Sequence, residues 1–171
     1  MLTKNDLIEW LKRIDNKLNR DITLTAVGGT ALVLLNLKES TIDVDFDIKK
    51  EDYDLFKKLS EGEFKVDLFI DGYIFSEQLP ENYVKLSENY TADFKHITLK
   101  ILDPIDIIIT KSARYNARDE EDIALLAKNF KIDKIGLLKR FETVVESYAG
   151  SESIFRDNFN IVLKRHFPQL K

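Results

Sequence analysis

The sequence of 171 residues contains no cysteine, three prolines and one methionine. Without cysteine, neither a disulfide framework nor a zinc-thiolate centre can form, so a bound metal must be held by oxygen ligands or by the two histidines. No apolar run approaches the roughly 18 residues that a membrane-spanning helix requires. The N-terminus also lacks a basic segment followed by an apolar one, and we therefore expect a cytoplasmic protein without a membrane partner.

Apolar and charged side chains are abundant, at 44% and 33% of the sequence. This composition is typical of a globular chain of about one domain that buries a core. The net charge of −4 comes from an acidic excess in residues 1–130, whereas residues 131–171 carry a small basic excess. A net-acidic chain without a dense basic run is not an obvious high-affinity nucleic-acid binder.

Periodicity outlines the order of elements along the chain. Alternating apolar and polar residues predict strands, and apolar residues spaced three and four apart predict helices. The predicted strands cover residues 22–27, 42–48, 64–71 and 95–102. Helices are predicted over 3–19, 30–37 and 49–61, after Asp103-Pro104, and twice within 133–167. We expect residues 1–130 to form a core and residues 131–171 a helical extension packed on it, as a single compact unit.

One stretch, residues 25–47, combines two features of nucleotide chemistry and reads TAVGGTALVLLNLKESTIDVDFD. A pair of glycines precedes the predicted helix, so backbone N–H groups can approach a phosphate. Asp43, Asp45 and Asp47 alternate on the next strand and therefore share one face. Alternate residues of a strand lie roughly 6.5–7 Å apart, which lets two carboxylates bracket one or two Mg²⁺ ions. The alternative is an amphipathic strand whose acidic face meets water.

The same stretch resembles the signature of the DNA polymerase β-type nucleotidyltransferase superfamily: a Gly-Gly or Gly-Ser turn, a short helix, and a strand bearing Asp-x-Asp. In detail, GGTALVLLNLKESTIDVDF is similar to stand-alone prokaryotic nucleotidyltransferase-like proteins related to the AbiEii-type toxins. Those proteins carry Ser or Thr two residues before the first Asp, as Thr41 does here. The resemblance implies an α/β (α+β) nucleotidyltransferase fold, with a mixed, largely antiparallel sheet flanked by helices and followed by C-terminal helices.

The resemblance also implies which residues carry a two-metal transfer of a nucleotide from an NTP to a hydroxyl group. Asp43 and Asp45 bind both Mg²⁺ ions. Asp67, on the next predicted strand, binds the catalytic ion and takes the proton of the attacking hydroxyl; a salt-bridged surface aspartate is the alternative for this residue. The residues expected to bind the nucleotide on the same chain segment are Gly28, Gly29, Thr30 and Thr41.

A second segment, residues 103–126, also resembles the family and reads DPIDIIITKSARYNARDEEDIALL. There, an Asp-Pro turn starts a helix that bears a lysine, followed by Arg-Asp and a further acid. Lys111 is the predicted nucleotide-binding lysine, and Arg114 projects from the same helix side. The alternative for Lys111 is an ordinary surface or salt-bridged lysine. For Arg118 and Asp122 we expect a structural ion pair between two helices.

The acceptor of the nucleotide is not readable from the sequence. The resemblance implies RNA, particularly tRNA, a role as the toxin of a toxin–antitoxin pair, and hence an antitoxin partner; other superfamily members modify proteins or small molecules. Two further hypotheses compete: a catalytically silent protein that keeps the fold to bind nucleotides or partners, and an unrelated metal-dependent hydrolase using the same carboxylates. An Asp67 that points away from Asp43 and Asp45 favours the silent protein.

Overall fold

The computed structural model describes residues 1–168, which divide into two compact units. The first unit contains residues 1–72 and 84–102, and the second contains residues 73–83 and the chain from residue 103 onwards. The boundary expected at residue 130 does not coincide with this division, because the helices between residues 104 and 129 pack with the C-terminal helices. Residues 169–171 of the expected extension lie outside the described part of the chain.

The first unit is built on a mixed sheet with the strand order β5-β4-β2-β9-β8. These strands are β2 (Ile22–Ala26), β4 (Val44–Ile48), β5 (Val66–Ile70), β8 (Glu88–Asn89) and β9 (Ile97–Ile101). The pairs β2–β4 and β8–β9 are antiparallel, as is the separate pair of β1 (Leu2–Thr3) with β3 (Ser40–Thr41). The predicted α+β class and its mixed, largely antiparallel sheet are confirmed, although the longer ladders β2–β9 and β4–β5 are parallel.

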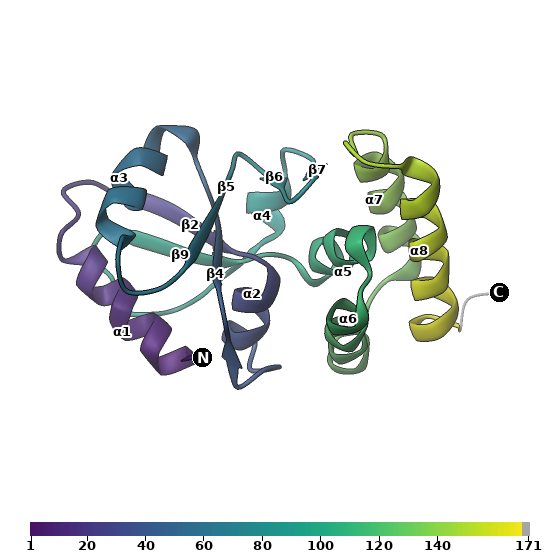
Figure 1. Ribbon diagram of the computed structural model, residues 1–171, viewed down its shortest axis with the longest axis horizontal. Coiled ribbons are helices and arrows are strands. Elements are labelled where there is room, and N and C mark those ends of the chain that lie inside the picture. The colour runs from purple at the N-terminus through teal and green to yellow at the C-terminus, as the bar shows by residue number, and fades with distance from the viewer. Residues whose placement is uncertain (169–171) are drawn as a thin grey trace. The chain divides into compact units, whose positions relative to one another are not determined.

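Helices cover both faces of this sheet (Figure 1). The helices α1 (Lys4–Asp15) and α3 (Lys50–Ser60) lie on one face, and α2 (Gly28–Leu34) lies on the other. Trp10 of α1 is buried against the edges of Phe56 and Phe64, with ring centroids 6.2 and 5.7 Å apart. Phe56 in turn meets Phe46 of β4 at 6.1 Å. This aromatic cluster forms the core between the two helices and the sheet, where edge-to-face contacts add to the burial of apolar surface.

The last residue of α1 anchors the start of β9. The buried carboxylate of Asp15 accepts backbone N–H groups from Lys95, His96 and Ile97 at 2.7, 2.8 and 2.8 Å. Burial raises the pKa of Asp15, but these three hydrogen bonds outweigh it and bring the pKa below its ordinary value. Asp15 therefore holds a strand that enters the sheet about 80 residues later in the chain.

The second unit consists of a small hairpin and four helices. The hairpin pairs β6 (Tyr73–Ile74) with β7 (Glu77–Gln78) in antiparallel fashion, and the short α4 (Tyr83–Leu86) lies where the chain passes back to the first unit. The longer helices are α5 (Pro104–Arg114), α6 (Ala117–Asn129), α7 (Lys134–Val145) and α8 (Glu152–His166).

The ends of these helices follow the sequence signals. Asp103 caps α5 by accepting the N–H of Ile105 at 2.9 Å, and Pro104 occupies the first helical turn, as predicted. The two helices expected in residues 133–167 are also present, and Phe141 of α7 stacks on Phe159 of α8 with ring centroids 3.7 Å apart. Throughout residues 1–168, no helix has both the length and the apolar character needed to cross a membrane.

Candidate functional site

The turn between β2 and α2 brings backbone without side chains against the acidic strand. Gly28 has a left-handed φ of +53°, and a Cβ atom there would lie 2.7 Å from Oδ2 of Asp45. At Gly29, a Cβ atom would lie 2.8 Å from Oγ1 of Thr41. Both distances are too short for real carbon atoms, and Gly28 also needs the positive φ that other residues adopt at a cost. The close approach of the turn to Asp45 and Thr41 therefore requires both glycines.

Thr30 does not cap α2, because the helix begins at Gly28 and its N-cap residue is Val27. Instead, Oγ1 of Thr30 accepts the backbone N–H of Asp45 at 2.9 Å. Oγ1 of Thr41 donates to the carbonyl oxygen of Asp43 at 2.9 Å. The two hydroxyl groups thus fix the backbone from which the aspartates project.

The structure brings the third predicted carboxylate beside the first two. Asp45 of β4 and Asp67 of β5 are register partners in a parallel ladder, so their side chains leave the sheet on the same face. Asp43 immediately precedes β4, and its side chain is 38% exposed, close to the 42% of Asp67. Asp47 differs, because its buried carboxylate accepts the N–H of Gly72 at 2.8 Å and ties the end of β5 to β4.

A lysine that the sequence analysis did not single out lies between two of these carboxylates. Nζ of Lys65 is 2.9 Å from Oδ2 of Asp67 and 3.4 Å from Oδ2 of Asp43. Hydrogen bonds with Asp67 and then Asp43 raise the pKa of Lys65 above its ordinary value. The available signal was the spacing of Lys65 and Asp67, which places both on one strand face, but the proximity to Asp43 depends on strand pairing.

The donor set of this site fits a divalent cation by its chemistry. Carboxylate oxygens from neighbouring strands are the ligands that Mg²⁺ prefers, and Lys65 already demonstrates that a cation is accommodated between Asp43 and Asp67. Within residues 1–168, however, no three acidic or histidine side chains gather closely enough to form a complete metal-ligand group. A metal ion therefore requires side-chain rearrangement, which the partial exposure of these aspartates permits.

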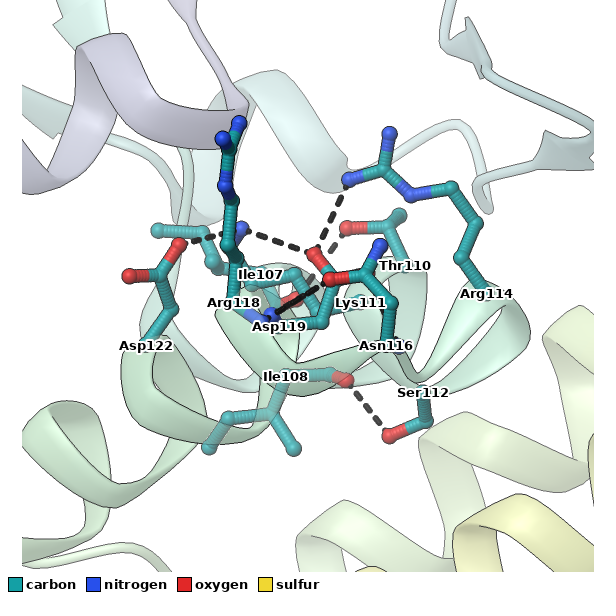
Figure 2. Close-up of polar contacts among 10 residues, drawn as sticks. All are labelled: Ile107, Ile108, Thr110, Lys111, Ser112, Arg114, Asn116, Arg118, Asp119 and Asp122. Carbon is teal, nitrogen blue, oxygen red and sulfur yellow. Dashed lines mark hydrogen bonds and ion pairs between the residues drawn. The ribbon is translucent and has the colours of Figure 1, made fainter. Parts of the chain in front are cut away.

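Lys111 belongs to the second unit, in a buried ion network shown in Figure 2. Its ammonium lies 3.2 Å from Oδ1 of Asp119 and 2.6 Å from Oδ2 of Asp122, and all three side chains are at most 4% exposed. Arg114 adds a contact with Oδ1 of Asp119 at 3.1 Å. Asp122 thus takes part in an ion pair between the two helices, as expected, and the pair is made with Lys111. Arg118 is exposed.

This network joins the two helices α5 and α6, because Lys111 and its two aspartates come from different helices. Asp119 has a second role, since its other oxygen accepts the backbone N–H of Asn116 and completes a capping box at the start of α6. The predicted contact of Lys111 with a nucleotide stays a prediction, and the contacts observed give the residue a structural role.

The carboxyl group of Glu77 in β7 is also buried in this unit, and the charge of Arg114 acts on it. One carboxylate oxygen accepts the N–H of Ser76 at 3.2 Å, while Oε1 has no hydrogen-bond partner among the described residues. Burial raises the pKa of Glu77 to about 7. Nothing in the local sequence indicated this burial, because it arises from long-range packing.

Of the comparisons with known proteins, the one with protein families gave a match, and that match is to a nucleotidyltransferase family. A family model described as "Nucleotidyltransferase of unknown function (DUF6036)" matches residues 5–161. This match includes the glycine turn, the aspartate strands and most of the helical second unit. Searches among curated proteins and among solved structures returned no match.

Proposed function

The chain belongs to this nucleotidyltransferase family, and we propose that it is a Mg²⁺-dependent enzyme that moves an NMP from an NTP to a hydroxyl group of an acceptor. Family membership implies a nucleotide substrate. The observation that carries the proposal is the register of Asp45 opposite Asp67, which puts Asp67 on the same face as Asp45. That placement supports the active enzyme, because an Asp67 pointing away from Asp45 would favour the silent protein.

Asp43, Asp45 and Asp67 are the residues proposed to hold Mg²⁺. All three are partly exposed and offer carboxylate oxygens, the chemistry that Mg²⁺ requires. When bound, Mg²⁺ offsets the negative charge that develops on the phosphate oxygens during transfer. The hydroxyl groups of Thr30 and Thr41 hold the backbone of this acidic segment in place, so the carboxylates start from fixed positions.

The β- and γ-phosphates are proposed to bind at Gly28, Gly29 and Thr30, with Thr41 beside them. A Cβ atom at either glycine would lie less than 3 Å from a side-chain oxygen of Asp45 or Thr41. The backbone of the turn therefore carries no side chain where it faces the acidic segment. The lack of side chains supports a close approach of the phosphates.

The proposed reaction exchanges one phosphorus–oxygen bond for another. The acceptor hydroxyl oxygen forms a bond to the α-phosphorus, and the bond from that phosphorus to the bridging oxygen of the β-phosphate breaks. Pyrophosphate leaves with the electron pair, and the hydroxyl proton passes to the carboxylate of Asp67. The partial exposure of Asp67 gives the acceptor access to it and lets the proton continue to solvent.

For the acceptor, we propose RNA, in particular tRNA, with the protein acting as the toxin of a toxin–antitoxin pair. The support is the similarity of residues 28–46 to stand-alone nucleotidyltransferase-like proteins related to the AbiEii-type toxins, including Thr41 two residues before Asp43. A second candidate function is a silent protein that binds nucleotides or partners without transfer. The specific observation in its favour is Lys65, whose ammonium already pairs with both Asp43 and Asp67.

The test is a transfer assay with each labelled NTP, Mg²⁺, and a mixture of tRNA and cell protein. Asp45→Asn is compared with the wild type and with Asp54→Asn, which removes an exposed carboxylate from α3 of the same unit. We expect label to be transferred by the wild type and by Asp54→Asn, and not by Asp45→Asn. Transfer retained in Asp45→Asn contradicts the metal assignment, and NTP–Mg²⁺ binding without transfer favours the silent protein.

A further inference from the structure

The position of Lys65 is set by the backbone of the sheet. The N–H of Val44 donates to the carbonyl oxygen of Lys65 at 2.9 Å, and the ladder continues with Val44 opposite Val66. Lys65 therefore stands across from Asp43 and two residues before Asp67 on one strand. Because side chains alternate along a strand, moving Lys65 to the other face would require the whole strand to slip.

The ammonium, unlike the backbone, is free to move. The Lys65 side chain is 64% exposed, and its two carboxylate partners are 38% and 42% exposed. Ion pairs in such exposed settings contribute little, because water replaces them readily and the flexible stem loses entropy when it is held. The ammonium can thus leave Asp43 and Asp67 and still remain at the edge of the site.

We propose that Lys65 is a resident counter-cation whose ammonium exchanges with the divalent cation and then pairs with the phosphates of the bound nucleotide. This inference rests on the proposed function, since it concerns the same carboxylates. Without ligands, the single positive charge of Lys65 lies close to both Asp43 and Asp67 and so limits the repulsion between them. An incoming divalent cation must displace the ammonium from both carboxylates. The displaced ammonium stays nearby, and its positive charge repels the cation and lowers the affinity for it.

The exchange couples the two ligands. A metal ion alone leaves the displaced ammonium without a partner, so its binding is weakened. A nucleotide supplies phosphate oxygens that take up the ammonium, so metal and nucleotide each strengthen the binding of the other by the same factor. The consequence is a carboxylate site that binds free divalent cations more weakly than it binds them together with the nucleotide.

The experiment measures Mn²⁺ binding by the electron paramagnetic resonance signal of the free ion, with and without a non-hydrolysable NTP analogue. Lys65→Met removes the charge and keeps the stem. Lys65→Arg keeps the charge, and Lys58→Met removes an exposed lysine from α3 as the matched control. Without nucleotide, we expect Lys65→Met to bind Mn²⁺ about tenfold more tightly than the wild type. Lys65→Arg and Lys58→Met should stay close to the wild type.

With the analogue present, and after subtraction of the Mn²⁺ that the analogue binds without protein, we expect Mn²⁺ affinity to rise in the wild type and in Lys58→Met. The rise should be smaller in Lys65→Met, because only the direct contact between metal and phosphates remains. Equal or weaker Mn²⁺ binding by Lys65→Met without the analogue, or an enhancement in it as large as that of the wild type, overturns the role of Lys65 while leaving the metal site intact. Absence of Mn²⁺ binding in the wild type and all variants, with the analogue present, overturns the proposed metal-dependent function as well. The circular dichroism spectrum of each variant verifies that it is folded.

Discussion

The two units each hold a lysine between two aspartates, and the two clusters differ mainly in exposure. The Lys65 side chain in the first unit is 64% exposed, whereas the Lys111 side chain in the second is 4% exposed. In water, an ion pair is weak and exchangeable, whereas a buried pair is costly to open because removal of one partner leaves an uncompensated charge. The same combination of one lysine and two aspartates therefore forms a replaceable cation site in one unit and a fixed connection between helices in the other.

The largest effect is expected from breaking the buried cluster. Lys111→Met leaves Asp119 and Asp122 buried without their ammonium, and we expect a loss of about 3–5 kcal/mol in the free energy of unfolding, measured by urea denaturation. Lys128→Met, at an exposed position of α6, is the control and should change little. A Lys111→Met protein as stable as the control would show that the cluster does not hold α5 and α6 together.

Glu77 sharpens the comparison, because its burial is only partly compensated by the N–H of Ser76 and the charge of Arg114. Its pKa rises from 4.5 to about 7 on folding, so the folded protein binds one proton more than the unfolded chain between these pH values. The stability of the wild type should therefore fall as the pH rises from 4.5 to 7 and stay lowered above that.

Glu77→Gln removes this titration, and we expect it to be more stable than the wild type at pH 8 by up to about 3 kcal/mol, with the difference vanishing near pH 4. Urea denaturation across this pH range measures the effect. Glu81→Gln, an exposed position of the same unit, should follow the wild type. Identical pH profiles for Glu77→Gln and the wild type contradict the burial of a neutral carboxyl group.

The smallest change in stability is expected at the exposed cluster. Lys65→Met should leave the urea midpoint close to that of the wild type, because water solvates Asp43 and Asp67 once the ammonium is gone. A loss as large as that of Lys111→Met would remove the distinction between the two clusters, and with it the exchangeability of Lys65.

The parts of the fold that the sequence predicted are those governed by local chemistry. Asp103 with Pro104 signalled the start of α5, and the alternation around Asp45 and Asp67 signalled two strands with carboxylates on a face. The glycine pair was also meaningful, although α2 starts at Gly28 and not at residue 30. Each of these signals acts within a few residues of the chain.

What the sequence did not predict depends on contacts between distant segments. The proximity of Lys65 to Asp43 follows from strand register, which periodicity leaves undetermined. The choice of Lys111 as a partner of Asp122 follows from which side chain is buried between the helices. Likewise, the hairpin of residues 73–78 belongs to the same unit as the C-terminal helices. The sequence of the hairpin alone does not indicate that it packs with these helices.

The parallel pairing of β2 with β9 has a consequence for the order of folding during synthesis. β2 is complete after residue 26, but one of its two neighbours, β9, is supplied only by residues 97–101. Until the ribosome has released that strand, one edge of β2 exposes unpaired backbone groups. During the same time, the carboxylate of Asp15 lacks the hydrogen bonds that it later accepts from the backbone N–H groups of residues 95–97. The nascent first unit is therefore exposed to wrong strand pairing while about 70 further residues are translated.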